Sequence, residues 1–145
     1  WTFYNSSGEQ LIYDAGAATE QATQAEAEAE SNVDKYIPPD LIKNSPGVAK
    51  VWCLYEEAGG HSIRVSYNMT SVTDGGATGD CDVLWATDFS GTYYSLVGGC
   101  EEQGYVQMSP GTNAAGGCTL ITTDNGNNAV DYSNPGPSFA VYGDQ

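Results

Sequence analysis

The sequence predicts a mainly β protein, in which a short N-terminal hairpin and two short helices precede a β-sandwich or barrel-like knob. Apolar side chains alternate strictly along one stretch, as in a strand with one buried face, at Ile63, Val65, Tyr67 and Met69. Turn residues recur about every 8–12 positions, the spacing of sandwiches and barrels. The 145 residues suffice for one domain and an extension. We therefore expect a trimerising segment at 1–47 and an all-β distal domain at 48–145.

The other strands follow from short apolar runs between turn signals. In the N-terminal segment, 1–4 and 10–13 flank a polar turn at 5–8 and predict a small hairpin. A hairpin of two strands is marginal by itself, so it needs support from elsewhere. In the distal domain, the apolar runs predict strands at 48–55, 61–70, 80–87, 92–97, 105–108, 118–123 and 138–142.

A first helix begins in the N-terminal segment. Thr23 and Glu26 form the capping-box pattern, in which the Thr hydroxyl accepts from the N–H of Glu26 and the carboxylate reaches back to the N–H of Thr23. This pattern predicts a helix start at about Gln24. We expect the helix to end at Ser31 and Asn32, with Asn32 in the left-handed conformation.

A second turn of helix begins at Pro38 and Pro39, because proline at the first helical position gives up only an N–H that has no partner. Its large apolar side chains are Leu41 and Ile42, which we expect to be buried where the segment meets the knob. Neither helix reaches the roughly 12–15 residues that an isolated helix needs in water. We therefore expect other copies of the chain to stabilise this segment, in a parallel homotrimer.

The charge of the chain excludes several classes of partner. Four Lys and Arg stand against 19 Asp and Glu, which gives a net charge of −15. Phosphate binding needs clustered basic residues, so we expect no nucleic-acid partner, and an anionic membrane surface is unfavourable for the same reason. The sequence has no apolar run of about 18 residues, so we expect no membrane insertion.

No cofactor is expected. The chain contains four cysteines but no Cys-x-x-Cys pair, and its single histidine, His61, has no cysteine nearby, so zinc is not expected. The even number favours at least one disulfide, with three possible connectivities, and the alternative is four buried free thiols. The four are Cys53, Cys81, Cys100 and Cys118. The oxygen-rich stretch 124–128 lacks the EF-hand pattern for Ca²⁺, so it predicts a turn, with a Ca²⁺ site as the alternative.

Paired carboxylates are the candidates for catalysis. The pairs are Glu56/Glu57, Asp80/Asp82 and Glu101/Glu102. A glycosidase needs two carboxyl groups about 5–9 Å apart across a cleft, and nothing in the sequence marks a cleft. His61 lacks a nucleophile context such as G-x-S-x-G. We expect solvated surface acids and no enzymatic activity.

The stretch Ala22-Thr-Gln-Ala-Glu26 resembles a segment of tail fibre proteins from tailed bacteriophages. The match continues loosely at 34–37, and Pro39 and Leu41 stand at the expected positions. Downstream, 44–52 and 64–80 resemble the distal β-domain that follows this segment, and 139–144 resembles its last strand.

The chain departs from this pattern at two places. The usual glycine at the first helix end is Glu30 or Ser31 here, so that end must be built differently. The usual threonine before proline is Pro38, so Asp40 must favour the second helix N-terminus electrostatically.

The resemblance implies a homotrimeric virion component, in a phage tail fibre or tail spike, that attaches an extracellular particle to its host. Its partners would be copies of itself, other virion tail proteins, and a glycan or protein on the host surface. Two alternatives stay open. One is a structural appendage, such as a head fibre or collar, with no receptor role. The other is a polysaccharide-degrading spike.

Long polar loops on a β-scaffold are the expected receptor contacts, at 73–79, 109–117 and 124–134. Tyrosine suits sugar stacking and protein surfaces, and asparagine supplies hydrogen bonds. The acidic field favours neutral or zwitterionic sugars or a basic protein patch. The candidate contact residues are Tyr94, Tyr105, Asn113, Asn125, Asn127 and Tyr132.

Overall fold

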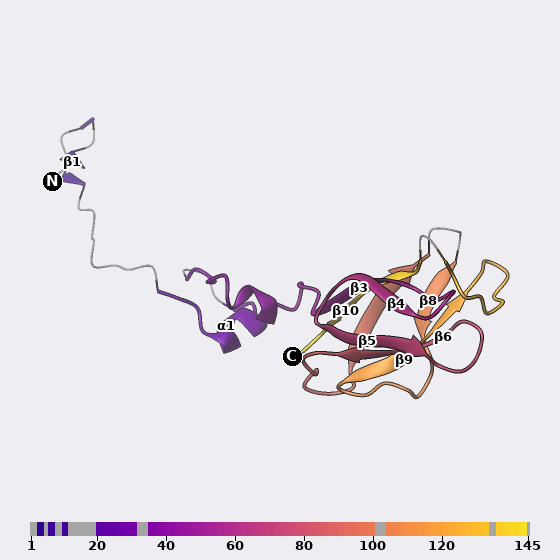
Figure 1. Ribbon diagram of the computed structural model, residues 1–145. Coiled ribbons are helices and arrows are strands. Elements are labelled where there is room, and N and C mark those ends of the chain that lie inside the picture. The colour runs from indigo at the N-terminus through magenta and orange to yellow at the C-terminus, as the bar shows by residue number, and fades with distance from the viewer. Residues whose placement is uncertain are drawn as a thin grey trace. The chain divides into compact units, whose positions relative to one another are not determined.

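The computed structural model of the chain describes residues 3–4, 6–7, 10–11, 20–31, 35–100, 104–133 and 136–144. It divides into two compact units, Trp1–Ile42 and Lys43–Gln145 (Figure 1). The sequence analysis places this boundary after residue 47, and the structural division falls after Ile42. Among the described residues, no helix is long and apolar enough to cross a membrane.

The first unit contains short elements only. Strand β1 (Phe3–Tyr4) pairs antiparallel with β2 (Gln10–Leu11), and the outer residues of the expected hairpin lie outside the described residues. Helix α1 (Gln24–Glu28) follows, and the 3₁₀ turn η1 (Ile42–Asn44) crosses the boundary between the units. At 39–41 the chain forms a turn, so the two prolines are followed by a turn and a 3₁₀ turn in place of an α-helix.

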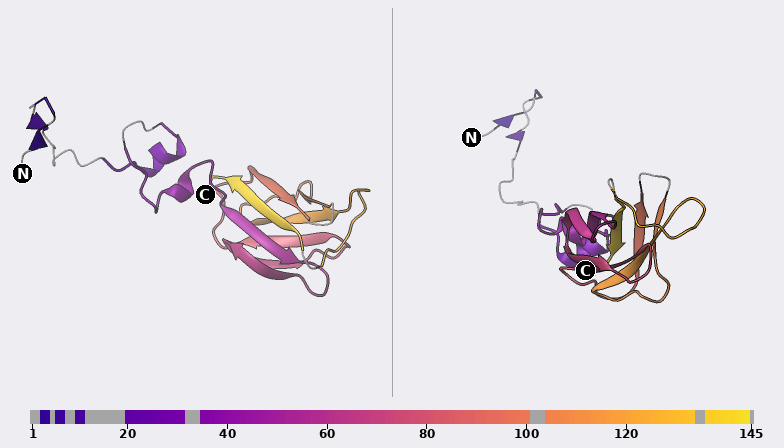
Figure 2. Two further views of the ribbon diagram at one scale, coloured as in Figure 1. Left: turned by 90° about the horizontal axis from the view of Figure 1, so that it is seen from above. Right: turned by 45° about the vertical axis from the view of Figure 1, so that its right-hand side comes forward.

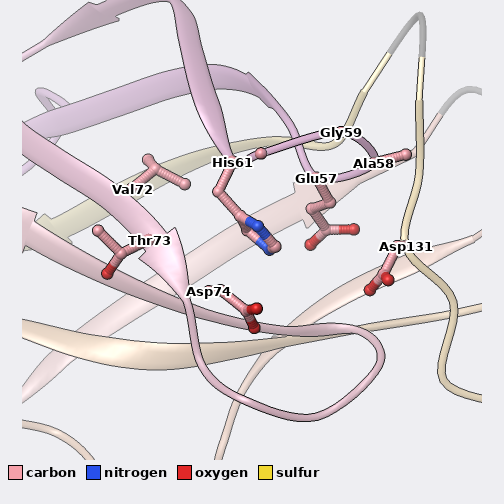
Figure 3. A pocket seen from close by; sticks show the side chains of 9 residues that line it. Glu57, Ala58, Gly59, His61, Val72, Thr73, Asp74 and Asp131 are labelled. Atoms are coloured by element: carbon pink, nitrogen blue, oxygen red, sulfur yellow. The ribbon is translucent and has the colours of Figure 1, made fainter.

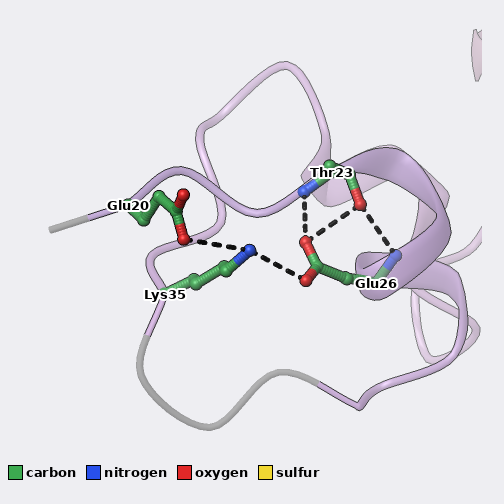
Figure 4. A network of polar contacts seen from close by, with 4 residues as sticks. All are labelled: Glu20, Thr23, Glu26 and Lys35. Carbon is green, nitrogen blue, oxygen red and sulfur yellow. Dashed lines mark hydrogen bonds and ion pairs between the residues drawn. The ribbon is translucent and has the colours of Figure 1, made fainter.

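A polar network holds the start of α1 (Figure 4). The N–H of Glu26 donates to the Thr23 hydroxyl at 3.3 Å, and the N–H of Thr23 donates to the Glu26 carboxylate at 2.9 Å. Lys35 donates to the other oxygen of Glu26 at 2.9 Å and pairs with Glu20 at 3.2 Å. Lys35 therefore connects the capping box to Glu20, which precedes the helix in the sequence.

The end of α1 is built on Glu30. Its φ of +48° is left-handed, its N–H donates to the carbonyl of Ala27, and the N–H of Ser31 donates to the carbonyl of Glu26 at 3.3 Å. This pair of bonds is the Schellman arrangement, which usually places glycine at the left-handed position. The expected left-handed residue, Asn32, lies outside the described residues.

Apolar side chains of the first unit are largely uncovered within one chain. Within one chain Ile42 is exposed and Leu41 is half-buried, so their burial where the segment meets the knob in a trimer stays a prediction. Tyr36 and Ile37 are exposed as well. The buried residues of this segment are small ones, namely Ala22, Ala27 and Pro38.

The second unit confirms the mainly β expectation, with two four-stranded antiparallel sheets in an arrangement compatible with a β-sandwich (Figure 2). The first sheet has the order β4-β3-β10-β7, with β3 Val51–Glu56, β4 Ser62–Tyr67, β7 Tyr94–Gly99 and β10 Ser138–Gly143. The second has the order β5-β6-β9-β8, with β5 Met69–Asp74, β6 Asp80–Trp85, β8 Tyr105–Met108 and β9 Gly117–Thr123.

The core lies between the inner faces of the two sheets. β3 alternates buried Val51, Cys53 and Tyr55 with less buried residues, and β6 does the same with Cys81, Val83 and Trp85. Aromatic rings fill one end, where Phe89 and Tyr94 stack at 4.8 Å between ring centroids. The alternation expected for 80–87 is therefore the one that the structure has.

All four cysteines are free, which corrects the expectation of at least one disulfide. Cys53, Cys81 and Cys118 are buried, and Cys100 is half-buried. Burial raises the pKa of Cys53 to about 12, so this thiol stays protonated at neutral pH. The thiols act as small apolar core side chains.

The predicted strand 61–70 is divided at Asn68, where the chain leaves one sheet and enters the other. Asn68 has a left-handed φ of +57°. Its amide donates to the carbonyls of Lys50 and Thr87 at 3.2 Å, and its side-chain oxygen accepts from the N–H of Thr87 at 2.7 Å. This one side chain therefore fastens the corner between the sheets.

A bulge also divides the four alternating apolar residues. Ile63 pairs with the buried Tyr55, whereas two positions on, Val65 pairs with the outward Leu54, and the register shifts between them. Arg64 is the extra residue. The expectation that 63, 65, 67 and 69 share one face is therefore wrong, because a bulge of one residue moves the following side chains to the other face.

We predict that Asn68→Ala lowers the free energy of unfolding by about 2–4 kcal/mol, because it loses the side-chain bonds and strains the left-handed backbone. Asn68→Gly keeps the backbone free of strain and should cost about half as much. Chemical denaturation of the full chain measures both. Equal losses for the two variants would contradict a backbone contribution.

We predict that the Glu26 carboxyl titrates near pH 2. The N–H of Thr23, first, and the hydrogen bond from Lys35, next, lower its pKa from 4.5 to about 2. The resulting stabilisation of the segment is present above about pH 4.5 and is lost as the pH falls toward 2. An NMR titration measures the midpoint, and Lys35→Ala should raise it part of the way. A wild-type midpoint in the ordinary range for glutamate would disprove the network.

Candidate functional site

Loops at one end of the knob line an open polar pocket of about 400 Å³ (Figure 3). Four titratable side chains are directed into the same space, from the β3–β4 turn, the end of β5 and the segment after β9. They are Glu57, His61, Asp74 and Asp131. Ala58, Gly59 and Gly60 form part of the wall, where small side chains leave the space open.

The carboxylate of Glu57 forms the floor and is only 2% exposed. Its Oε2 accepts from the N–H of Tyr132 at 2.9 Å, and its two oxygens lie 2.9 and 3.0 Å from the Thr122 hydroxyl. The Tyr55 hydroxyl lies 3.3 Å from Oε1. Donors from β3, β9 and the segment after it thus converge on one carboxylate.

The backbone of Glu57 fixes the same segment. The N–H groups of Glu57 and Ala58 both donate to the carbonyl of Tyr132, at 3.0 and 3.2 Å. Burial is the main cause of the raised pKa of Glu57, and the hydrogen bonds from Tyr132, Thr122 and Tyr55 oppose it. Those donors are the reason that a carboxyl group can occupy this position.

Gly79 joins two of the long loops at the pocket. Its N–H donates to the Asp131 carboxylate at 2.6 Å, and its carbonyl accepts from the N–H of Thr122 at 2.8 Å. Its φ is +78°, and a Cβ there would stand 2.6 Å from the carbonyl oxygen of Thr122, so only glycine fits. The expected loops 73–79 and 124–134 are therefore brought together, apart from residue 134, which lies outside the described residues.

His61 closes the β3–β4 turn. Its N–H donates to the carbonyl of Glu57 at 3.3 Å, and its φ is +46°. Its Nε2 is buried and has no hydrogen-bond partner among the described residues. A buried polar atom without a partner is uncommon in folded proteins, and this one lines a pocket.

The pocket presents mostly hydrogen-bond acceptors. Three carboxyl groups and one imidazole line it, and no Lys or Arg is among the lining residues. No group of three or more Cys, His, Asp or Glu side chains among the described residues is arranged to hold a metal ion. The complementary ligand offers hydroxyl or ammonium hydrogens, as sugars and amino sugars do.

Two predicted contact residues are buried, which corrects the expectation that their side chains meet a receptor. The ring of Tyr94 lies in the core, and its hydroxyl lies 2.9 Å from the carbonyl of Gly117. The side chain of Tyr132 is buried too, with its hydroxyl 3.3 Å from the carbonyl of Thr123. The sequence analysis counted both among the receptor contacts, but Tyr94 packs on Trp85 and Phe89 in the core.

The other predicted contact residues are accessible but scattered. Tyr105, Asn125 and Asn127 are exposed, and Asn113 is half-buried. None of these four is among the residues that line the pocket. The third predicted loop, 109–117, borders a separate hollow of about 320 Å³ beside β6 and β9.

The acid pairs have different environments. Glu56 pairs with Arg64 at 2.9 Å at the surface, while Glu57 beside it is buried. Asp80 and Asp82 are both half-buried, and the third pair, Glu101 and Glu102, lies outside the described residues.

The stretch 124–128 is a turn, as the sequence analysis expected. The Asp124 carboxylate accepts from the backbone N–H groups of Gly126 and Asn128, both at 2.8 Å, and from the Asn128 side chain at 2.9 Å. Hydrogen bonds from Asn128, side chain first, lower the pKa of Asp124. Its oxygens are therefore used within the loop.

Sequence reasoning missed the main residues of the pocket. From the sequence, Glu57 and His61 were interpreted as exposed residues of a turn. The segment that covers them lies some 70 residues further along the chain, at 131–132, so no local signal marks their burial. The glycines at 59 and 60 were the only local signal of an unusual backbone. Comparison with known proteins finds no matching family model, curated protein or solved structure.

We predict that Glu57 makes stability depend on pH. Because burial raises its pKa in the folded state, its stabilising contribution is fully present below the unfolded pKa, about 4.3, and is lost as the pH rises through the folded pKa. Glu57→Gln should remove this part of the dependence. Denaturation from pH 4 to 8 measures it, and Glu56→Gln controls for net charge. Parallel curves for wild type and Glu57→Gln would contradict the prediction.

Proposed function

We propose that this chain is the distal part of a phage tail fibre or tail spike, a homotrimeric virion component that attaches the particle to its host. The pocket formed by Glu57, His61, Asp74 and Asp131 is the proposed receptor site. Its proposed ligand is a neutral or amino-bearing sugar of the host surface. Three such sites on one trimer, repeated over several fibres, would raise the avidity of a weak contact by orders of magnitude.

The observation that carries the binding role is the convergence of two polar loops on one pocket. Gly79 and Asp131 bond across the loops, so the pocket wall is fixed before a ligand arrives. A fixed wall reduces the ordering that binding requires. The Nε2 of His61, which lacks a hydrogen-bond partner in the described part of the chain, is the atom proposed to bond the ligand.

The first unit supports the fibre assignment and the homotrimer. Its capping box lies in the stretch that resembles the fibre segment, and Glu30 makes a left-handed helix end where that segment has glycine. Ile37 and Ile42 are exposed in a single chain, so neighbouring copies would gain by covering them. Other tail proteins of the virion would join this end.

We propose binding without hydrolysis. The buried carboxyl group of the pocket, on Glu57, accepts from the N–H of Tyr132 and lies beside the Thr122 hydroxyl, so it is directed at groups of the protein itself. No cofactor, nucleic acid or membrane insertion is part of the proposal.

A structural appendage, such as a head fibre or collar, is the second candidate. The observation that favours it is that the loops bond to one another, through Gly79, Asp131 and Thr122, as they would if they served only to brace the knob. Antibody labelling of intact virions distinguishes the two candidates, because only a receptor-binding fibre places the knob at a tail-fibre tip.

We predict that Asp74→Asn weakens binding about tenfold or more to a sugar that the wild type binds on a glycan array. The reason is that a hydrogen bond to a charged group contributes about 1.5–3 kcal/mol. The variant keeps the oxygen that accepts from the N–H of Gly76 at 2.7 Å, so the loop should remain folded. His61→Asn should weaken binding as well, because asparagine tolerates the left-handed backbone but does not reach as far. A glycan array followed by calorimetry measures both effects.

Thr78→Ala is the control, because Thr78 is exposed on the same loop and does not line the pocket. The control should bind as wild type does. Binding that survives both pocket variants would place the receptor site elsewhere, and release of new reducing ends from a bound polysaccharide would favour the degrading spike.

A further inference from the structure

The outer face of the β4-β3-β10-β7 sheet is apolar where a sandwich usually presents polar side chains to water. Cross-strand pairing puts Tyr67, Trp52, Ala140 and Val97 in one row across all four strands. Trp52 is 40% exposed, Tyr67 48% and Val97 66%. Contiguous exposed apolar surface on a sheet commonly marks an interaction site.

The bulge at Arg64 enlarges this face. Because the register shifts there, Ile63 packs against the core while Val65 and Tyr67 turn outward. Val65 is 49% exposed and lies opposite Leu54 in a second row. Without the bulge, strict alternation would put Val65 and Tyr67 on the same side as Ile63, facing the core.

The face is also hollowed. A shallow, open depression of about 430 Å³ lies beside Trp52 and Val97, with Ser138 and Ala140 in its lining. Gly98 and Gly99 contribute no side chain there. An apolar surface of another protein could pack over this shallow depression.

The outer faces of the two sheets differ in charge. On the four described strands β4, β3, β10 and β7, the one carboxylate is that of Glu56, at the margin, where Arg64 neutralises it at 2.9 Å. The outer face of the second sheet carries Asp80 and Asp82 on its central strand β6. Copies of a chain with net charge −15 repel one another, so they approach most easily through a face free of unpaired carboxylates.

We propose that this outer face is where the knobs of separate copies of this chain pack on one another. The contact is distinct from the N-terminal segment and does not depend on the receptor role. Four strands about 4.8 Å apart and six residues long at about 3.3 Å each give a flat area of about 380 Å². A standard interface buries about 800 Å² per partner, so the knob contact is weak by itself and assists an association held elsewhere as well.

Two double variants of the full chain test the inference. Val65→Glu with Val97→Glu adds two negative charges to the proposed face. Leu84→Glu with Tyr105→Glu adds the same charge to the outer face of the other sheet, at side chains that are 51% and 61% exposed. Sedimentation from about 1 to 100 μM compares association, and we expect a loss of about tenfold or more for the first variant and less than about twofold for the control.

A second measurement reports whether the proposed face is covered. In a Trp1→Phe background, acrylamide quenching reports on Trp52, because the other tryptophan, Trp85, is buried. Trp52 should be shielded in the associated wild type and quenched more readily in the Val65→Glu, Val97→Glu variant. Tyr67→Ser provides a variant that removes apolar surface without adding charge.

The outcomes separate this inference from the proposed homotrimer. An oligomer that persists in the first variant, with Trp52 equally quenched in both proteins, overturns the knob contact and leaves the N-terminal association intact. A wild type that stays monomeric at every concentration overturns both. Trp52 that is shielded in a dilute monomer means that the same chain covers the face, which also overturns the inference.

Discussion

The buried carboxylate of Glu57 is the interaction on which the proposed site depends. It collects the N–H of Tyr132 and the hydroxyl of Thr122, and the Glu57 backbone in turn donates to the carbonyl of Tyr132. These bonds hold the segment after β9 against the β3–β4 turn. The pocket therefore owes its shape to one acidic group whose burial is unfavourable unless each of its oxygens accepts a hydrogen bond.

The knob thus has two surfaces of opposite character. The pocket lies among acidic loops and suits a ligand rich in hydrogen-bond donors. The outer face of the first sheet is apolar and nearly uncharged, and suits a surface like itself. Because the two lie on different parts of the knob, self-association and ligand binding need not compete. The proposed attachment role, in which several copies act together, is compatible with this arrangement.

Most strands of the knob were predictable because their signals are local, but β5 (Met69–Asp74) was missed, since its start was joined to the predicted strand 61–70 and its end to the predicted loop 73–79. The run 105–108 matches β8, and 118–123 differs from β9 only at its first residue. The face of each strand was less predictable, since one extra residue at Arg64 moves Val65 and Tyr67 to the other side. For the site, the sequence analysis found two of the loops that border the pocket, but it named none of the four side chains directed into it as a receptor contact. It assigned the buried Tyr94 and Tyr132 to the surface.

The sequence by itself determined the features that depend on neighbours within a few residues. These are the capping box of Thr23 and Glu26, the turn at Asp124, the strand positions and the acidic charge. The tertiary structure alone decided the features that join distant parts of the chain, namely the burial of Glu57 beneath Tyr132 and the fastening of the Asn68 corner to Thr87. The physical reason is that a residue's partners in a sheet sandwich come from strands tens of residues away. A buried acid and a solvated acid therefore look the same until the strands that surround them are in place.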